Sequence, residues 1–206
     1  MANKRRAHTN KKLPPAVRNS LALLLVLGLG MLYLIKTISD QSSSAQETQQ
    51  VSSQNQITQA FIQEIGSSAA AIAQEHDLYA SVMIAQAILE SSSGRSGLSQ
   101  APSYNLFGIK GDYNGQSVTM QTWEDDGSGN TYTIDASFRA YANRSESLED
   151  YANLLDRPLY QAVHKSQTNS YQDATAALTG TYATDTSYGS KLNAIIERYN
   201  LTSYDK

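Results

Sequence analysis

Glu90 is set apart from the other acidic residues by the sequence around it. It is the only acidic residue between Leu78 and Lys110, and it ends a strongly apolar run. If that run is a helix, burial against residues such as Met83 and the negative end of the helix dipole both raise the pKa of this carboxyl group. A carboxylic acid that stays protonated near neutral pH can protonate a leaving-group oxygen, as glycoside cleavage requires. On composition alone, a surface glutamate at a helix end is the better explanation.

Most other catalytic chemistries are excluded by missing residues or by wrong spacing. The chain has no cysteine, which excludes disulfides, thiolate metal sites and a cysteine nucleophile. Gly94–Gly97 lacks the spacing of a serine nucleophile elbow, and no phosphate-binding loop or dinucleotide fingerprint occurs. Beyond the first forty residues only His76 and His164 remain, too few for a histidine-rich zinc site, and the acidic turn 125–130 lacks the glycine and the distal glutamate of a calcium loop. We therefore expect no metal and no cofactor.

Helical and strand patterns after residue 56 predict the elements that position Glu90. Apolar residues at helical spacing predict a first helix from Ile57 to about residue 74, and the apolar run itself predicts a central helix from Ala80 to about residue 92, with Gly94 as its stop. Two strands follow around the acidic turn, at 118–123 and 131–138, and in the second strand alternate residues share one face: Tyr132, Ile134, Ala136 and Phe138. Further helices are predicted at 147–155, 171–178 and 188–199. This order predicts one α+β domain, mainly helical, with a small β-hairpin lobe.

The first forty residues differ from the rest in charge. They hold seven of the sixteen basic residues and one acid, so the remainder carries a net charge of −9, which argues against nucleic-acid binding. Seventeen uncharged residues separate Arg18 from Lys36, and as a helix they reach about 26 Å against a hydrocarbon core of about 30 Å. Because basic residues precede this run, the positive-inside rule places the N-terminus in the cytoplasm.

These observations predict four parts of the chain. They are a basic cytoplasmic tail (1–18), a signal-anchor transmembrane helix (19–36), a flexible Ser/Gln-rich linker (37–56) and a folded catalytic domain (57–203). The alternative is a signal peptide cleaved after Ser43-Ser44-Ala45. Either way the domain is expected outside the cytoplasmic membrane, as a monomer.

Several motifs together resemble glycoside hydrolase family 73, the peptidoglycan-cleaving N-acetylglucosaminidases of bacterial walls. The resemblance begins with Ser81–Ser91 and Gly94, and continues with Tyr104–Lys110. It extends over about residues 57–201, through Thr122-Trp123-Glu124, Phe138–Tyr141, Tyr182–Asp185, Tyr188 and Lys191-Leu192. It departs at Ser93, where the family commonly has an aromatic residue.

The resemblance implies a lysozyme-like fold, a peptidoglycan substrate and no cofactor. It implies that Glu90 is the general acid and that Glu124, on the hairpin, is a second carboxylate that activates water. It further implies substrate contacts from Asn105, Phe107, Lys110 and Tyr182, whereas Trp123 either stacks on a sugar or packs within the hairpin lobe.

Three alternatives stay open at this point. A lytic transglycosylase or a muramidase of the same fold would also use a glutamate at a helix end, although Gly97-Leu98-Ser99-Gln100 follows Glu90 too closely to match the transglycosylase motif. A catalytically weak wall-binding domain that tethers membrane to peptidoglycan is the third. The mechanism is open too, since inversion, a covalent intermediate and assistance from the substrate's acetamido group each suit two carboxylates.

Overall fold

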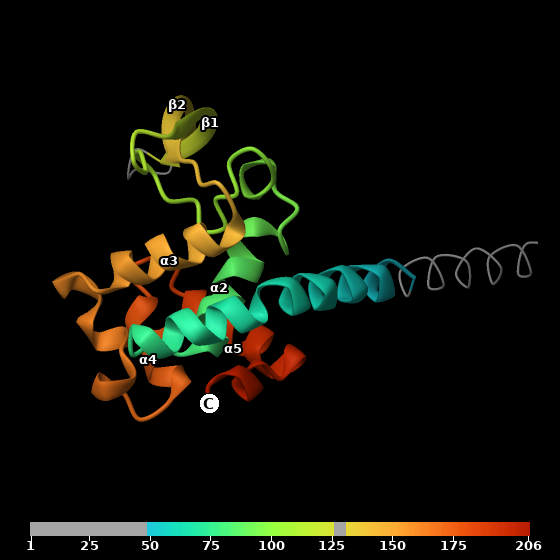
Figure 1. Ribbon diagram of the computed structural model, residues 1–206, viewed down its shortest axis with the longest axis vertical. Helices are drawn as coiled ribbons and strands as arrows, with labels where there is room; N and C mark the ends of the chain where they lie inside the picture. Colours follow the sequence, from blue (N-terminus) through green and yellow to red (C-terminus); the bar gives the residue numbers. More distant parts are fainter. Residues whose placement is uncertain (1–48, 126–130) are drawn as a thin grey trace, which may run out of the picture. The chain divides into compact units, whose positions relative to one another are not determined.

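A computed structural model describes residues 49–125 and 131–206 of the chain. The chain divides into two units, 1–53 and 54–206, and the second contains the elements discussed here. In order they are a helix over residues 54–75, α2 (Ala80–Ser91), β1 (Ser117–Asp125), β2 (Thr131–Arg139), α3 (Arg144–Leu155), α4 (Tyr171–Leu178) and α5 (Tyr188–Tyr199) (Figure 1). Short 3₁₀ helices occur at Gly97–Ser99, Pro158–Val163, Lys165–Gln167 and Leu201–Tyr204. The predicted α+β class with a mainly helical domain is confirmed.

The predicted transmembrane helix at 19–36 lies outside the described residues. Among the helices that the structure does describe, none combines the length and the apolar character needed to cross a membrane.

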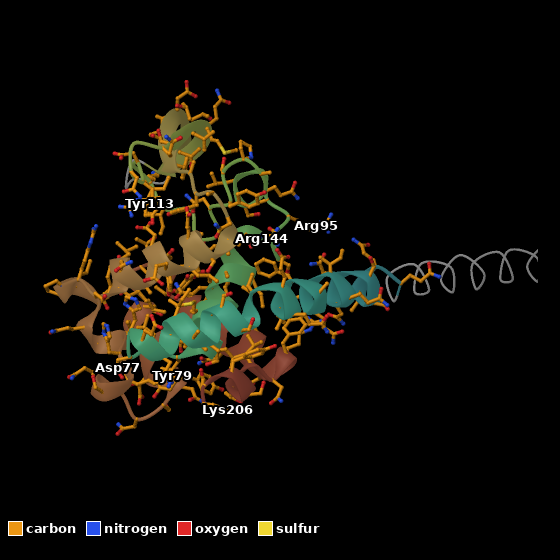
Figure 2. The ribbon with its side chains drawn as sticks, in the orientation of Figure 1. Asp77, Tyr79, Arg95, Tyr113, Arg144 and Lys206 are labelled. Atoms are coloured by element: carbon orange, nitrogen blue, oxygen red, sulfur yellow. The ribbon has the colours of Figure 1, made fainter. Side chains whose placement is uncertain are left out.

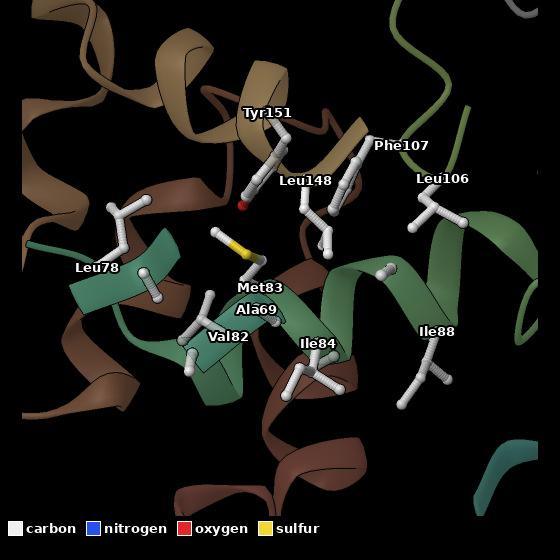
Figure 3. Close-up of a cluster of buried hydrophobic side chains, with 14 of the residues drawn as sticks. Ala69, Leu78, Val82, Met83, Ile84, Ile88, Leu106, Phe107, Leu148 and Tyr151 are labelled. Atoms are coloured by element: carbon white, nitrogen blue, oxygen red, sulfur yellow. The ribbon is translucent and has the colours of Figure 1, made fainter. Parts of the chain in front are cut away.

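Helix α2 forms the centre of the hydrophobic core, as its apolar sequence predicts. Ten of its twelve residues are buried. Met83 points from α2 towards Tyr151 of α3, and Phe107 and Leu148 lie over the same helix (Figure 3). A helix that is apolar on nearly every side is stable only when other elements surround it, and here α3, α4, α5 and the first helix do so. The last turn of α2, which contains Glu90, is thereby held by the surrounding core.

The chain leaves α2 through three consecutive residues with left-handed backbone conformation. Ser92, Ser93 and Gly94 have φ values of 53°, 59° and 74°. The predicted stop at Gly94 therefore comes two residues late, because Ser92 already caps the helix. Gly94 is still required, since a Cβ atom there would lie 2.7 Å from the ring of Phe61. Left-handed serines are unfavourable on their own, so neighbouring side chains must hold this turn.

Three side chains hold the turn after α2. The backbone N–H of Gly94 donates to Ser91 Oγ at 2.7 Å. Ser93 is buried and its hydroxyl bonds to the hydroxyl of Thr58 at 2.8 Å. Arg144, labelled beside this turn in Figure 2, donates through Nη2 to the carbonyl of Gly94 at 3.3 Å. Residue 93, where the family commonly has an aromatic side chain, thus packs towards the first helix.

The two strands form one antiparallel hairpin that is longer than the sequence predicts. Its register runs from Ser117 opposite Arg139 to Asp125 opposite Thr131. On the predicted apolar face Ala136 is buried, whereas Ile134 is 38% exposed. The hairpin therefore packs on the domain near its base, where Ala136 and Phe138 are buried.

The start of α3 differs from the sequence prediction. Helix α3 begins at Arg144 rather than 147, because Asn143 Oδ1 accepts from the Glu146 N–H and Glu146 Oε2 accepts from the Ala142 N–H, each at 3.0 Å. Asn143 is thus the N-cap and satisfies an N–H group that a helix start leaves unpaired, while Glu146 holds the residue before the cap. Helices α4 and α5 have the bounds that the sequence predicts.

The flexible linker predicted over 37–56 is wrong for residues 49–56, which are helical. Glutamine is a good helix former, and the exposed positions of a helix need no apolar residue. Asn55 in this stretch also accepts hydrogen bonds from Arg198 Nη2 at 2.6 Å and from the Tyr199 hydroxyl at 3.2 Å. These contacts with the end of α5 favour a helix where composition alone predicts a flexible segment.

Candidate active site

Glu90 lies in the last turn of α2 with its side chain open to solvent. The hydroxyl of Tyr188, at the start of α5, donates to Glu90 Oε1 at 2.7 Å. The protein around the carboxyl group raises its pKa by desolvation, and the hydrogen bond from Tyr188 opposes that rise. The group is thus accessible to a substrate and holds its proton more strongly than an ordinary glutamate. Both properties suit a general acid.

A chain of buried polar groups continues inward from Glu90. Gln86, one turn earlier on α2 and fully buried, donates through Nε2 to the Tyr188 oxygen at 2.9 Å. The hydroxyl of Tyr151, which is also fully buried, donates to Gln86 Oε1. These hydrogen bonds join α3, α2 and α5 directly behind the carboxyl group.

Aromatic rings pack around this polar chain. Phe107 stacks on Tyr151 with ring centroids 4.0 Å apart, and Tyr182 stacks on Tyr188 at 6.0 Å. The Tyr182 hydroxyl donates to the carbonyl of Phe107 at 3.0 Å. Burial raises the pKa of Tyr182, and the nearby charges of Tyr151 and Glu90 add to the rise. Tyr182 thus packs against Tyr188, whose hydroxyl bonds to Glu90, and its predicted role in positioning the substrate stays a prediction.

Asn105 organises the loop that carries Phe107. It is 1% exposed, and its amide donates to the carbonyls of Ile109 at 3.0 Å and Arg139 at 2.9 Å. Its Oδ1 accepts from the N–H groups of Phe107 at 3.3 Å and Ile109 at 3.1 Å. Asn105 and Phe107 are thus both buried, and contact of either side chain with a sugar stays a prediction.

The other predicted site residues lie on or beside the hairpin. Lys110 is exposed and its backbone bridges to Phe138 near the hairpin base. Trp123 and Glu124 lie in β1 opposite Thr133 and Tyr132. The predictions for the side chains of Trp123 and Glu124 fall outside the part of the structure that is described.

Sequence patterns gave only weak signals for three residues of this site. Gln86 lies four residues before Glu90 on the same helix face and is a polar residue in an apolar helix, which marks it in retrospect. Tyr188 belongs to the motifs that resemble the family, without a role attached to it. Tyr151 lies in the predicted helix 147–155 and carries no mark of its own.

Residues 49–125 and 131–206 contain no group of three or more His, Asp or Glu side chains placed to hold a metal ion.

Known proteins share this sequence and this fold. A family model described as mannosyl-glycoprotein endo-beta-N-acetylglucosaminidase matches residues 66–201. The catalytic domain of the autolysin Auto from Listeria monocytogenes is 51% identical, with a TM-score of 0.69 over 72% of this chain and 88% of that chain. An autolysin from Enterococcus faecalis is 55% identical over 152 residues, which are 70% of this chain and 20% of that protein. The exo-glucosaminidase LytG from Bacillus subtilis is 37% identical over 194 residues, which are 91% of this chain and 66% of LytG.

Matches to three of the curated relatives cover between 20% and 35% of their length. The family model, in contrast, covers most of the domain that carries Glu90, Tyr182 and Tyr188. The lysozyme-like fold that the motifs imply is the fold of these solved relatives. The chain therefore belongs to the mannosyl-glycoprotein endo-beta-N-acetylglucosaminidase family of glycoside hydrolases.

Proposed function

We propose that this protein hydrolyses the β-1,4 bond on the reducing side of N-acetylglucosamine in peptidoglycan, with Glu90 as the general acid. The observation that carries the proposal is the Glu90 carboxyl group, which is open to solvent and yet has a raised pKa. Such a group holds its proton to higher pH than an ordinary glutamate does and can pass it to the glycosidic oxygen as the bond breaks.

Glu124 is the proposed second carboxylate, carried on β1 of the hairpin. A separation of about 6.5–9.5 Å from Glu90 would leave room for an attacking water and give inversion, whereas about 5–5.5 Å would give a covalent intermediate. The substrate's acetamido group is a third possible nucleophile. Asn105, Phe107, Lys110, Tyr182 and Trp123 are proposed to bind or position the sugars, the buried ones through the loop that they hold.

The product of digestion tests the reaction. The purified full chain is incubated with peptidoglycan in the presence of a metal chelator, and the fragments are reduced with borohydride and identified by mass spectrometry. We expect reduced N-acetylglucosamine ends. Reduced muramic ends would indicate a muramidase, anhydro-muramic ends a lytic transglycosylase, and an absence of fragments a binding domain.

We also propose that residues 19–36 anchor the protein in the cytoplasmic membrane, with residues 1–18 in the cytoplasm and the catalytic domain outside. Support comes from the seventeen uncharged residues between Arg18 and Lys36 and from the six basic residues that precede them. An anchored enzyme would act on glycan near the membrane. Residues 49–56 of the predicted tether are helical.

Cell fractionation tests this topology. We expect the protein in the membrane fraction at its full 22.5 kDa, resistant to washing with high salt. Protease added to intact wall-stripped cells should remove the domain and spare the N-terminal tail. Recovery mainly from the medium, with a new N-terminus near Gln46, would show that the segment is a cleaved signal peptide.

A further inference from the structure

Gln86 is a buried amide in the most apolar helix of the domain. Its side chain is 0% exposed, and burying an amide without hydrogen bonds is strongly unfavourable. Both ends of the amide are paired, with Tyr151 on the oxygen and with Tyr188 on the nitrogen. These partners lie 65 and 102 residues away in sequence, so the tertiary fold brings them to this amide.

The pairing gives the hydrogen-bond chain a direction. Tyr151 donates to the amide oxygen, so the amide nitrogen, which can only donate, faces Tyr188. The Tyr188 oxygen accepts that hydrogen bond, and its single proton is left for Glu90 Oε1 at 2.7 Å. An ionised carboxylate can only accept hydrogen bonds, so this direction matches an ionised Glu90.

Tyr188 is the member of the hydrogen-bond chain that contacts the Glu90 carboxylate. Among the side chains that the structure describes, the titratable groups that interact with Glu90 are Tyr188 on α5, Tyr182 before α5 and Tyr151 on α3. Among the described side chains, burial raises the pKa of Glu90 and the Tyr188 hydrogen bond is the interaction that lowers it. The ionised form of Glu90 is therefore stabilised by the hydrogen bond that Tyr188 donates.

We propose that Gln86, held by Tyr151, is a positioning residue that directs the Tyr188 hydroxyl proton onto Glu90. The inference rests on the proposed function only where it concerns the rate, because the hydrogen-bond chain exists whatever Glu90 does. If Glu90 is the general acid, activity falls as the pH rises through the pKa of Glu90. The hydrogen bonds from Tyr151 through Gln86 and Tyr188 then set the highest pH at which the enzyme is active. Weakening these hydrogen bonds destabilises the ionised form of Glu90. The pKa of Glu90 then rises, and the fall in activity moves to higher pH.

Direct titration of Glu90 in the full chain tests the proposal. Glutamate carboxyl carbons are labelled with ¹³C, the Glu90 signal is assigned by its loss in Glu90→Gln, and its pKa is measured by NMR. Tyr188→Phe removes a hydrogen bond to a charged group, so we expect the pKa of Glu90 to rise by about one unit. Gln86→Met keeps the volume without a donor and should give a rise in the same direction, as should Tyr151→Phe to a smaller extent.

Two kinds of control accompany the titration. Gln63→Met on the exposed face of the first helix and Tyr171→Phe on α4 make the same chemical changes away from Glu90 and should leave its pKa unchanged. All variants are repeated with Glu124→Gln, so that coupling to the second carboxylate does not enter the comparison. The upper limb of the pH profile of kcat/KM for peptidoglycan cleavage is measured in parallel, without the Glu124 substitution.

The outcomes separate this inference from the proposed function. A folded Gln86→Met protein with an unchanged Glu90 pKa would overturn the inference. If Gln86→Met does not fold, an unchanged Glu90 titration in Tyr151→Phe overturns it. If the titration moves as expected and the limb of the rate profile does not follow, the hydrogen-bond chain stands and Glu90 is not the general acid.

Discussion

Replacing Glu90 with glutamine is expected to lower the rate of peptidoglycan cleavage by roughly 10²–10⁴-fold, the usual contribution of a general acid. The glutamine keeps the shape of the side chain, and its oxygen can still accept the hydrogen bond from Tyr188. It has no proton to transfer at the pH of the reaction. The measurement is the initial rate of reducing-end release by the full chain at neutral pH.

Controls for binding and folding show whether a lower rate of Glu90→Gln reflects lost catalysis rather than lost substrate binding or misfolding. Because the substitution preserves the surface, Glu90→Gln protein should sediment with insoluble peptidoglycan as the parent does and should unfold at a similar temperature. Glu197→Gln on the exposed face of α5 makes the same chemical change and should leave the rate unaltered. A Glu90→Gln variant with near-normal turnover would remove Glu90 from the mechanism.

The sequence predicts the elements of this fold best where burial follows a simple period. Helices α2, α4 and α5 have bounds within a residue of those expected, α2 because its sequence is one long apolar run and the other two because apolar positions recur at helical spacing. The 3₁₀ helices carry no such period and were not predicted. The sequence predicts a flexible linker at residues 49–56, but they form a helix. That helix is favoured by contacts of Asn55 with the end of α5, 143 residues away.

In the candidate site, too, local sequence patterns predict some residues, whereas contacts between distant parts of the sequence determine others. Glu90 could be singled out because its neighbours in sequence are also its neighbours in space. The roles of Gln86, Tyr151 and Tyr188 could not, since their hydrogen bonds join residues 65 to 102 positions apart. The left-handed turn at Ser92 and Ser93 was missed for a related reason. Serine does not favour that conformation, and Thr58 and Arg144, distant in sequence, hold it in place.

A second cluster of charges ties the base of the hairpin to α3. Asp150 is 7% exposed and accepts from Arg139 Nη1 at 2.7 and 2.6 Å and from the Tyr141 hydroxyl at 2.7 Å. Arg139 is the last residue of β2, and its carbonyl accepts from Asn105. Burial raises the pKa of Tyr141 and its hydrogen bond to Asp150 raises it further. The same carboxylate therefore supports the hairpin that carries Glu124 and the loop that carries Phe107.

Replacing Asp150 with alanine is expected to lower the free energy of unfolding by about 2–4 kcal/mol. Removing one partner of a buried ion pair costs about 3–5 kcal/mol, and the 19% exposure of the Arg139 side chain reduces that somewhat. Urea unfolding followed by circular dichroism measures the change, with Glu197→Gln as the control for loss of an exposed carboxylate. The double variant Arg139→Met/Asp150→Ala leaves no unpaired charge, so its loss of stability should be smaller than the sum of the two single losses.

Cleavage should also weaken in Asp150→Ala at temperatures where the protein is still folded, because the hairpin base has lost its tie to α3. An Asp150→Ala protein as stable as the parent would show that the cluster does not hold the lobe in place.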